Sequence, residues 1–153
     1  MQSRVKRHRR GAALLVPLAL GLGSTFVGCG ASRVTECNEV IGIVNGGLKK
    51  LEEGGASADA DKAEKIAYLR SMAATMDKLA DDLSKTKTTI PELKAFSLRY
   101  QKLAKDVATA ARDMADAVDQ NDVAKHAKAR DALDKLSDEE GPLVGDINQY
   151  CKG

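Results

Sequence analysis

Aromatic side chains are scarce in this chain of 153 residues, which has no tryptophan, three tyrosines and two phenylalanines. Apolar burial must therefore come from many small and medium-sized side chains, and closely packed helices bury such side chains best. The sequence also lacks a nucleophile elbow, a phosphate-binding glycine loop and the H-E-x-x-H and zinc-deaminase signatures. These absences argue against the common hydrolytic and nucleotide-dependent chemistries, and we expect the protein not to be an enzyme.

The N-terminal segment combines a basic start with an apolar run. The run extends from Gly11 to Leu22, is interrupted only by Pro17, and is too short to span a membrane comfortably. Five basic residues precede it: Arg4, Lys6, Arg7, Arg9 and Arg10. This order of a charged and an apolar region is typical of an export signal.

A small residue and a cysteine follow this segment. Val27, Gly28 and Cys29 close it, and this ending resembles the lipobox of bacterial lipoproteins. The resemblance implies that signal peptidase II removes residues 1–28 and that Cys29 becomes a mature N-terminus carrying acyl chains such as palmitate. It also implies a lipid-anchored location in a bacterial cell envelope, and Gly30 after the cysteine favours the outer membrane.

The positive charge of the chain belongs to the signal. Without residues 1–28 the chain keeps 19 basic and 22 acidic side chains, a formal net charge of −3. No basic stripe with interleaved aromatic residues remains in the body, so nucleic-acid binding loses its support. The remaining length suits one domain with one core.

Three cysteines are present, and the lipobox assigns one of them. Cys37 and Cys151 then remain as an even pair. Because an exported protein meets an oxidising compartment, we expect these two residues to form a disulfide. Such a bond would enclose nearly the whole mature chain, for which the chain-entropy model gives about 4 to 5 kcal/mol of stabilisation.

Apolar residues recur at alternating spacings of three and four in four segments, which predicts four amphipathic helices. The inward positions are Val34, Cys37, Ile41, Val44, Leu48 and Leu51; then Ile66, Leu69, Ala73, Met76, Ala80 and Leu83; then Leu93, Phe96, Tyr100, Leu103, Val107, Ala110, Met114 and Ala117; and finally Ala129, Leu133, Leu136, Leu143, Ile147 and Tyr150 or Cys151. Short loops between such helices favour an antiparallel up-down-up-down four-helix bundle.

Local residue types set the expected helix boundaries. The second helix should begin near Ser57 or Asp59, and the third should be capped by Thr89 ahead of Pro91. Glycines 46 and 47 lie inside the first helix, where they either allow a close helix contact or mark a weak point. Gly141-Pro142 should kink the fourth helix or break it for one turn.

The predicted disulfide orients the bundle. It joins the start of the first helix to the end of the fourth, and a tether of residues 29–33 would hold this end close to the membrane. Lys85 and Lys87, in the loop at the same end, would then face lipid head groups or simply solubilise the loop. Acidic residues should gather at the opposite end, where Asp59, Asp61, Asp119 and Asp122 either cap helices or bind a cation or a basic partner.

One constellation suggests a cofactor. Folding the last two helices onto each other brings Met114 level with His126, the only histidine outside the signal. A Met/His pair between helices resembles the haem ligation of small four-helix cytochromes and also suits copper. No C-x-x-C-H motif is present, and methionine at helical spacing is usually core.

The leading interpretation is therefore a lipid-anchored, non-catalytic structural or interaction protein with a helical domain over residues 34–153. Its partners would be the membrane and another protein, and it would need no cofactor. Two alternatives remain: a bundle that binds haem or copper through Met114 and His126, and a signal that stays uncleaved as the anchor.

Overall fold

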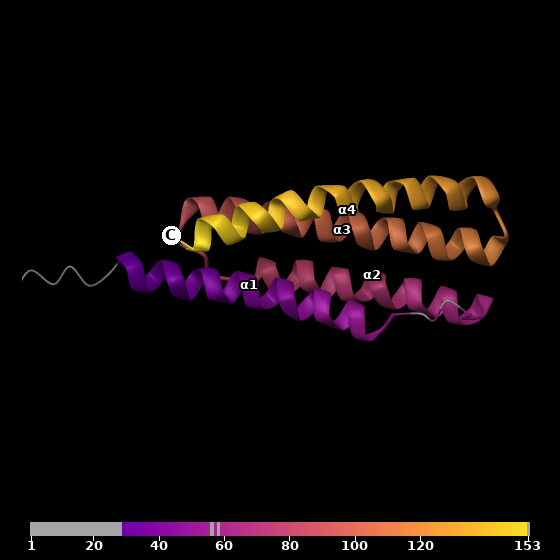
Figure 1. Cartoon of the computed structure of the whole chain (residues 1–153), viewed down its shortest axis with the longest axis horizontal. Helices are drawn as coiled ribbons and strands as arrows, with labels where there is room; N and C mark the ends of the chain where they lie inside the picture. The colour runs from indigo at the N-terminus through magenta and orange to yellow at the C-terminus, as the bar shows by residue number, and fades with distance from the viewer. Residues whose placement is uncertain (1–28, 56, 58, 153) are drawn as a thin grey trace, which may run out of the picture.

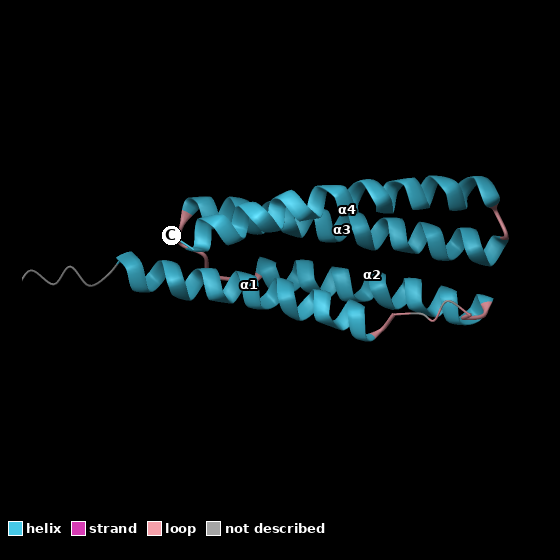
Figure 2. Cartoon of the chain, viewed as in Figure 1, coloured by secondary structure: helices cyan, strands magenta, loops and turns pink. Residues whose placement is uncertain are grey.

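The computed structural model describes residues 29–55, 57 and 59–152, and four α-helices make up nearly all of this part of the chain (Figures 1 and 2). They are α1 (Cys29–Glu53), α2 (Lys62–Ser84), α3 (Pro91–Gln120) and α4 (Val123–Lys152). The described residues contain no strand, so the expected all-α class is confirmed. The proposed export signal lies outside the described residues.

The helix starts follow from local capping. Asp61 caps α2, where its side chain accepts from the Glu64 backbone N–H at 2.9 Å and Glu64 accepts from the Asp61 backbone N–H at 3.0 Å. This reciprocal pair starts α2 later than the predicted Ser57 or Asp59. α1 begins earlier than expected, at Cys29, so residues 29–33 are helical and do not form an extended tether.

The core is built from small and medium-sized side chains, as the shortage of aromatics predicts. α2 and α3 make the most extensive contact, α3 and α4 the next, and α1 packs mainly on α2. Fully buried alanines allow this closeness, including Ala80, Ala104, Ala108 and Ala111. Tyr100 is the largest fully buried side chain.

Gly47 marks the close approach between α1 and α2. A Cβ atom built there would lie 2.2 Å from Cδ1 of Leu79, whereas one at Gly46 would meet no atom within 4 Å. The prediction that this glycine pair admits a neighbouring helix therefore holds for Gly47. Gly46 has no such role.

Two predicted core stripes need correction. In α1 the buried residues are Cys37, Val40 and Val44, while Val34 is 57% exposed and Ile41 only half-buried. The packing of α1 on α2 rotates its buried face away from the stripe that spacing alone suggested.

In α4, Leu133 and Leu136 are only half-buried. The reason is that α4 makes no contact with α2 and little with α1, so much of α4 rests on α3 alone.

Of the two outcomes predicted at Gly141-Pro142, a kink or a one-turn break, the break is wrong. α4 runs without interruption from Val123 to Lys152 and contains Pro142. Proline removes one backbone donor, which would have served the carbonyl of Asp138. Because Pro142 and Asp138 are both exposed, water can satisfy that carbonyl and the helix continues.

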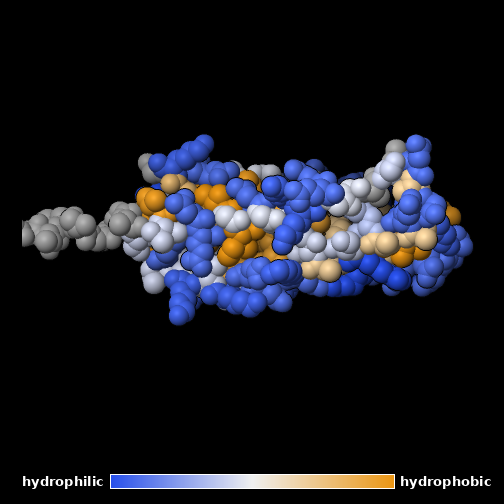
Figure 3. All heavy atoms as spheres, turned by 90° about the horizontal axis from the view of Figure 1, so that it is seen from below, coloured by the Kyte–Doolittle hydropathy of each residue, from blue (hydrophilic) through white to orange (hydrophobic). Residues whose placement is uncertain are grey.

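The C-terminus lies at the end of the body where α1 and α3 begin (Figure 1). Figure 3, which views the molecule from the side of α1 and α2, shows hydrophobic surface mainly over the half nearer this end. Partly buried Ile41, Ile43 and Leu48 belong to α1 and pack against the core.

Candidate functional site

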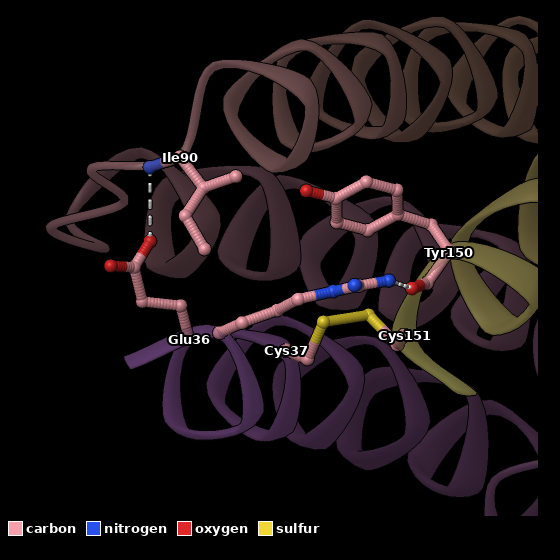
Figure 4. Close-up of a disulfide and its surroundings, with 6 residues drawn as sticks. Glu36, Cys37, Ile90, Tyr150 and Cys151 are labelled. Carbon is pink, nitrogen blue, oxygen red and sulfur yellow. Dashed lines mark hydrogen bonds between the residues drawn. A yellow bond between two sulfur atoms is a disulfide. The ribbon is translucent and has the colours of Figure 1, made fainter. Parts of the chain in front are cut away.

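The described chain is closed at one end by Cys37 of α1 and Cys151 of α4. Their sulfur atoms lie 2.11 Å apart and their Cα atoms 5.7 Å apart, across a sequence separation of 114 residues. Cys37 is buried and Cys151 half-buried. The predicted pair is thus at disulfide distance, and we call the surrounding cluster of Arg33, Glu36, Cys37, Ile90, Tyr150 and Cys151 the disulfide end (Figure 4).

Arg33 joins α1 to the end of α4 beside the disulfide. Its guanidinium donates to the backbone carbonyl of Tyr150 and lies 4.5 Å from the centroid of the Tyr150 ring (Figure 4). Phe96 of α3 meets the same ring edge-on, with 5.7 Å between ring centroids. A cation over a ring and an edge-to-face pair each add modest stabilisation to the burial.

Glu36 links α1 to the start of α3. Its carboxylate accepts from the backbone N–H of Thr89 at 2.8 Å, from that of Ile90 at 3.2 Å, and from the Thr89 hydroxyl at 2.5 Å. The hydroxyl of Thr89, followed by its backbone N–H and that of Ile90, holds the pKa of Glu36 below its ordinary value. A side chain from another helix therefore does what an N-cap residue would do.

This contact corrects the predicted cap of α3. Ile90, not Thr89, is the N-cap residue, and it makes no side-chain cap hydrogen bond. Pro91 occupies the first turn as predicted. Thr89 directs its hydroxyl to Glu36 of α1 instead.

The loop between α2 and α3 contains Lys85 and Lys87, both exposed. The Lys85 ammonium lies 3.7 Å from the carboxylate of Asp82, which also pairs with Lys78 at 2.6 Å. The loop leads directly into Thr89 and Ile90, which Glu36 contacts, so the loop lies beside the disulfide end.

The predicted acidic tip lies at the far end of the body, where α2 and α4 begin. Asp61 caps α2, and the Asp122 carboxylate accepts from the Lys125 backbone N–H at 2.9 Å at the start of α4. The Asp119 carbonyl accepts from Lys62 at 2.8 Å, and Asp59 is exposed. Helix capping therefore accounts for Asp61 and Asp122, which favours that reading over a cation site.

Met114 and His126 differ in environment. Met114 is 7% exposed and belongs to the buried face of α3, whereas His126 is exposed on α4. Within the described ranges, no group of three or more His, Cys, Asp or Glu side chains could hold a metal ion. This geometry offers no support for the haem or copper alternative.

Sequence reasoning missed a partly buried polar contact between α3 and α4. The hydroxyl of the fully buried Tyr100 donates to the carboxylate of Glu140. Burial, followed by this hydrogen bond, raises the pKa of Tyr100. The two residues lie 40 positions apart, so no local sequence pattern could have indicated the contact.

No helix in the described part of the chain is long and apolar enough to cross a membrane. In comparisons with known proteins, no family model, curated protein or solved structure matches the chain.

Proposed function

We propose that this protein is a lipid-anchored bacterial envelope protein that acts as a non-catalytic structural or interaction module. Its body would be an antiparallel up-down-up-down bundle, and the disulfide end would face the membrane. Lys85 and Lys87 would face lipid head groups, and the tip with Asp59, Asp61, Asp119 and Asp122 would point toward a protein partner.

The observation that carries the proposal is the division of the three cysteines. Cys37 and Cys151 lie at disulfide distance, which leaves Cys29 as the third cysteine, directly after the small residue of the lipobox-like ending. An exported chain with an odd cysteine calls for a separate role for it, and acylation provides one.

The start of α1 supports the orientation. α1 begins at Cys29, and Cys37 lies eight positions further along the helix, a rise of about 12 Å. A lipid on Cys29 would therefore hold the disulfide end near the bilayer. Each exposed lysine at this end could add about 1 kcal/mol of attraction to an anionic surface.

Replacing Cys29 with serine tests the anchor. We expect the full-length wild-type protein, expressed in bacteria, to incorporate radiolabelled palmitate and to fractionate with membranes. The Cys29→Ser variant should lose the label and move to the soluble fraction, because acyl chains hold the protein. The matched control, Cys37→Ser, should keep both the label and the membrane location.

Mass spectrometry of the mature N-terminus separates the outcomes. An acylated Cys29 as the first residue supports the proposal. Retention of Met1, or membrane association of an unlabelled Cys29→Ser variant, would show that the apolar segment itself is the anchor.

A further inference from the structure

A continuous groove runs along the outer side of α3 and α4. It consists of three hollows of about 550, 390 and 330 Å³. The first two share Lys102, Asp106 and Glu139 in their linings, and the last two share Asp113 and Ala132. We call this surface the α3–α4 groove.

The groove lies on the side of α3 that faces away from the core. The fully buried alanines Ala104, Ala108 and Ala111 mark the core side, and at about 100° per residue Asp106 and Asp113 lie roughly opposite to them. Leu136 and Ala132, which line the groove on α4, stay half-exposed. Apolar surface is therefore left uncovered between two charged rims.

The charges on the rims follow a regular pattern. On α3, basic residues line the part nearest the disulfide end and acidic residues the remainder; on α4 the order is reversed. Counted from the disulfide end, the charged lining residues are Arg99, Lys102, Asp106, Asp113 and Asp116 on α3, and Glu139, Asp138, Lys135, Lys128 and Lys125 on α4.

Most of these charges have a partner within their own chain. Lys102 pairs with Asp106 at 2.5 Å and Lys135 with Glu139 at 4.0 Å. Outside the groove lining, Arg99 pairs with Asp146 of α4 at 3.6 Å, Asp116 with Arg70 of α2 at 3.9 Å, and Lys125 with Asp122 at 3.7 Å. Because exposed ion pairs of this kind contribute little stability, the two rims can exchange them for pairs with another surface of opposite pattern.

We propose that the α3–α4 groove is a self-association surface, which binds a second copy of this chain in parallel orientation. A two-fold axis along the helices sets α3 of one copy over α4 of the other, so that basic and acidic halves meet along the whole length. The parallel arrangement rests on the proposed function, because two copies anchored through Cys29 in one membrane point the same way.

The size of the surface fits a weak dimer that the membrane strengthens. From Arg99 to Gln120 the groove follows α3 for about 32 Å. A strip of that length and two helices wide offers about 600 Å² per copy, below the roughly 800 Å² of a standard interface. Anchoring in one bilayer raises the effective concentration of the copies.

Charge exchange tests the pairing. An acidic variant carries Lys125→Glu and Lys128→Glu, and a basic variant carries Asp113→Lys and Asp116→Lys. Two differently tagged full-length copies are expressed in the same bacterial cells, the membranes are solubilised in a mild non-ionic detergent, and one tag is captured while the other is quantified.

We expect recovery of the second copy to fall about tenfold for acidic with acidic and for basic with basic, relative to the wild-type pair. Co-expression of the acidic variant with the basic variant should restore the recovery, because each α3 then meets an α4 of opposite charge. Since mixing leaves the contacts within each chain unchanged, restoration can arise only between chains. The matched control, Lys65→Glu with Lys105→Glu, alters exposed lysines outside the groove and should leave recovery unchanged.

Equal recovery in all combinations would overturn the proposal. Failure of the mixed pair to recover would overturn the parallel arrangement, since an antiparallel pair would set acidic against acidic residues. If a charge variant fails to fold, as judged by circular dichroism, Ala132→Glu in the groove floor provides a second test and should also lower recovery. Mass spectrometry shows in each preparation whether Cys29 is acylated. Loss of the lipid anchor can therefore be told apart from loss of the dimer.

Discussion

The carboxylate of Glu36 accepts the backbone N–H of Thr89 at 2.8 Å and its hydroxyl at 2.5 Å, which ties the beginning of α1 to the beginning of α3. Together with the disulfide and the contact of Arg33 with Tyr150, this link holds α1 at the disulfide end. Elsewhere α1 makes few contacts with α3 and α4. The disulfide end therefore joins α1 to α3 and α4, whereas α2 supports the rest of α1.

Removing the charge of Glu36 should destabilise the protein in a pH-dependent way. The pKa of Glu36 is lowered in the folded state, chiefly by the Thr89 hydroxyl. Its stabilising contribution is therefore present above the ordinary glutamate pKa of about 4.3 and is lost as the pH falls through the lower folded value. Thermal melts of Glu36→Gln should show a lower midpoint than wild type at pH 7, and the two should converge in acid. Glu39→Gln, an exposed change on the same helix, should follow the wild type throughout.

Loss of the disulfide should cost much of the stability of the domain. The bond closes a separation of 114 residues, so the free energy of unfolding should fall by about 4 kcal/mol in a Cys37→Ala, Cys151→Ala variant. Urea titration with and without reductant measures this. Reductant should shift the wild-type curve and leave the double variant unaffected; a wild-type curve insensitive to reductant would mean that the two cysteines are not bonded.

Alanine at the neighbouring glycines 46 and 47 should act in opposite directions. Gly46→Ala places a Cβ in open space and should raise stability by about 1 kcal/mol through helix propensity. Gly47→Ala places a Cβ 2.2 Å from Leu79, so the overpacking should outweigh the propensity gain and lower stability by about 1 kcal/mol. Two equally stabilised variants would contradict the close packing of α1 on α2.

Replacing Tyr100 with phenylalanine should remove its hydrogen bond to Glu140 and cost about 1 to 3 kcal/mol in urea titration at pH 7. The pKa of Tyr100 is raised in the folded state, mainly by burial. The contribution of Tyr100 to stability is therefore independent of pH below the ordinary tyrosine pKa of about 10 and falls as the pH rises above it, because only the unfolded chain ionises there. The gap between wild type and Tyr100→Phe should narrow above pH 10.

Contacts over short sequence distances were predicted more accurately than contacts between helices. The regular stripe of α3 correctly placed Leu93, Tyr100 and Met114 in the core, because eight turns on one helix average out local exceptions. For the shorter α1, the predicted stripe included the exposed Val34 and missed the buried Val40. The reason is that the packing of α1 against α2 decides which face of α1 is buried. The cap of α3 was also misassigned, because its acceptor comes from Glu36, 53 residues earlier.

The all-helical class and the four amphipathic segments could be predicted from the sequence because periodicity is a local property. The pairing of Cys37 with Cys151 could be predicted only because the lipobox resemblance assigned Cys29 to another role. The cap that Glu36 provides for α3, the hydrogen bond of Tyr100 to Glu140 and the charged groove between α3 and α4 could be seen only in the folded chain. These features depend on the rotation and separation of packed helices. Those quantities are set by the fit of side chains from distant segments, which no single stretch of sequence contains.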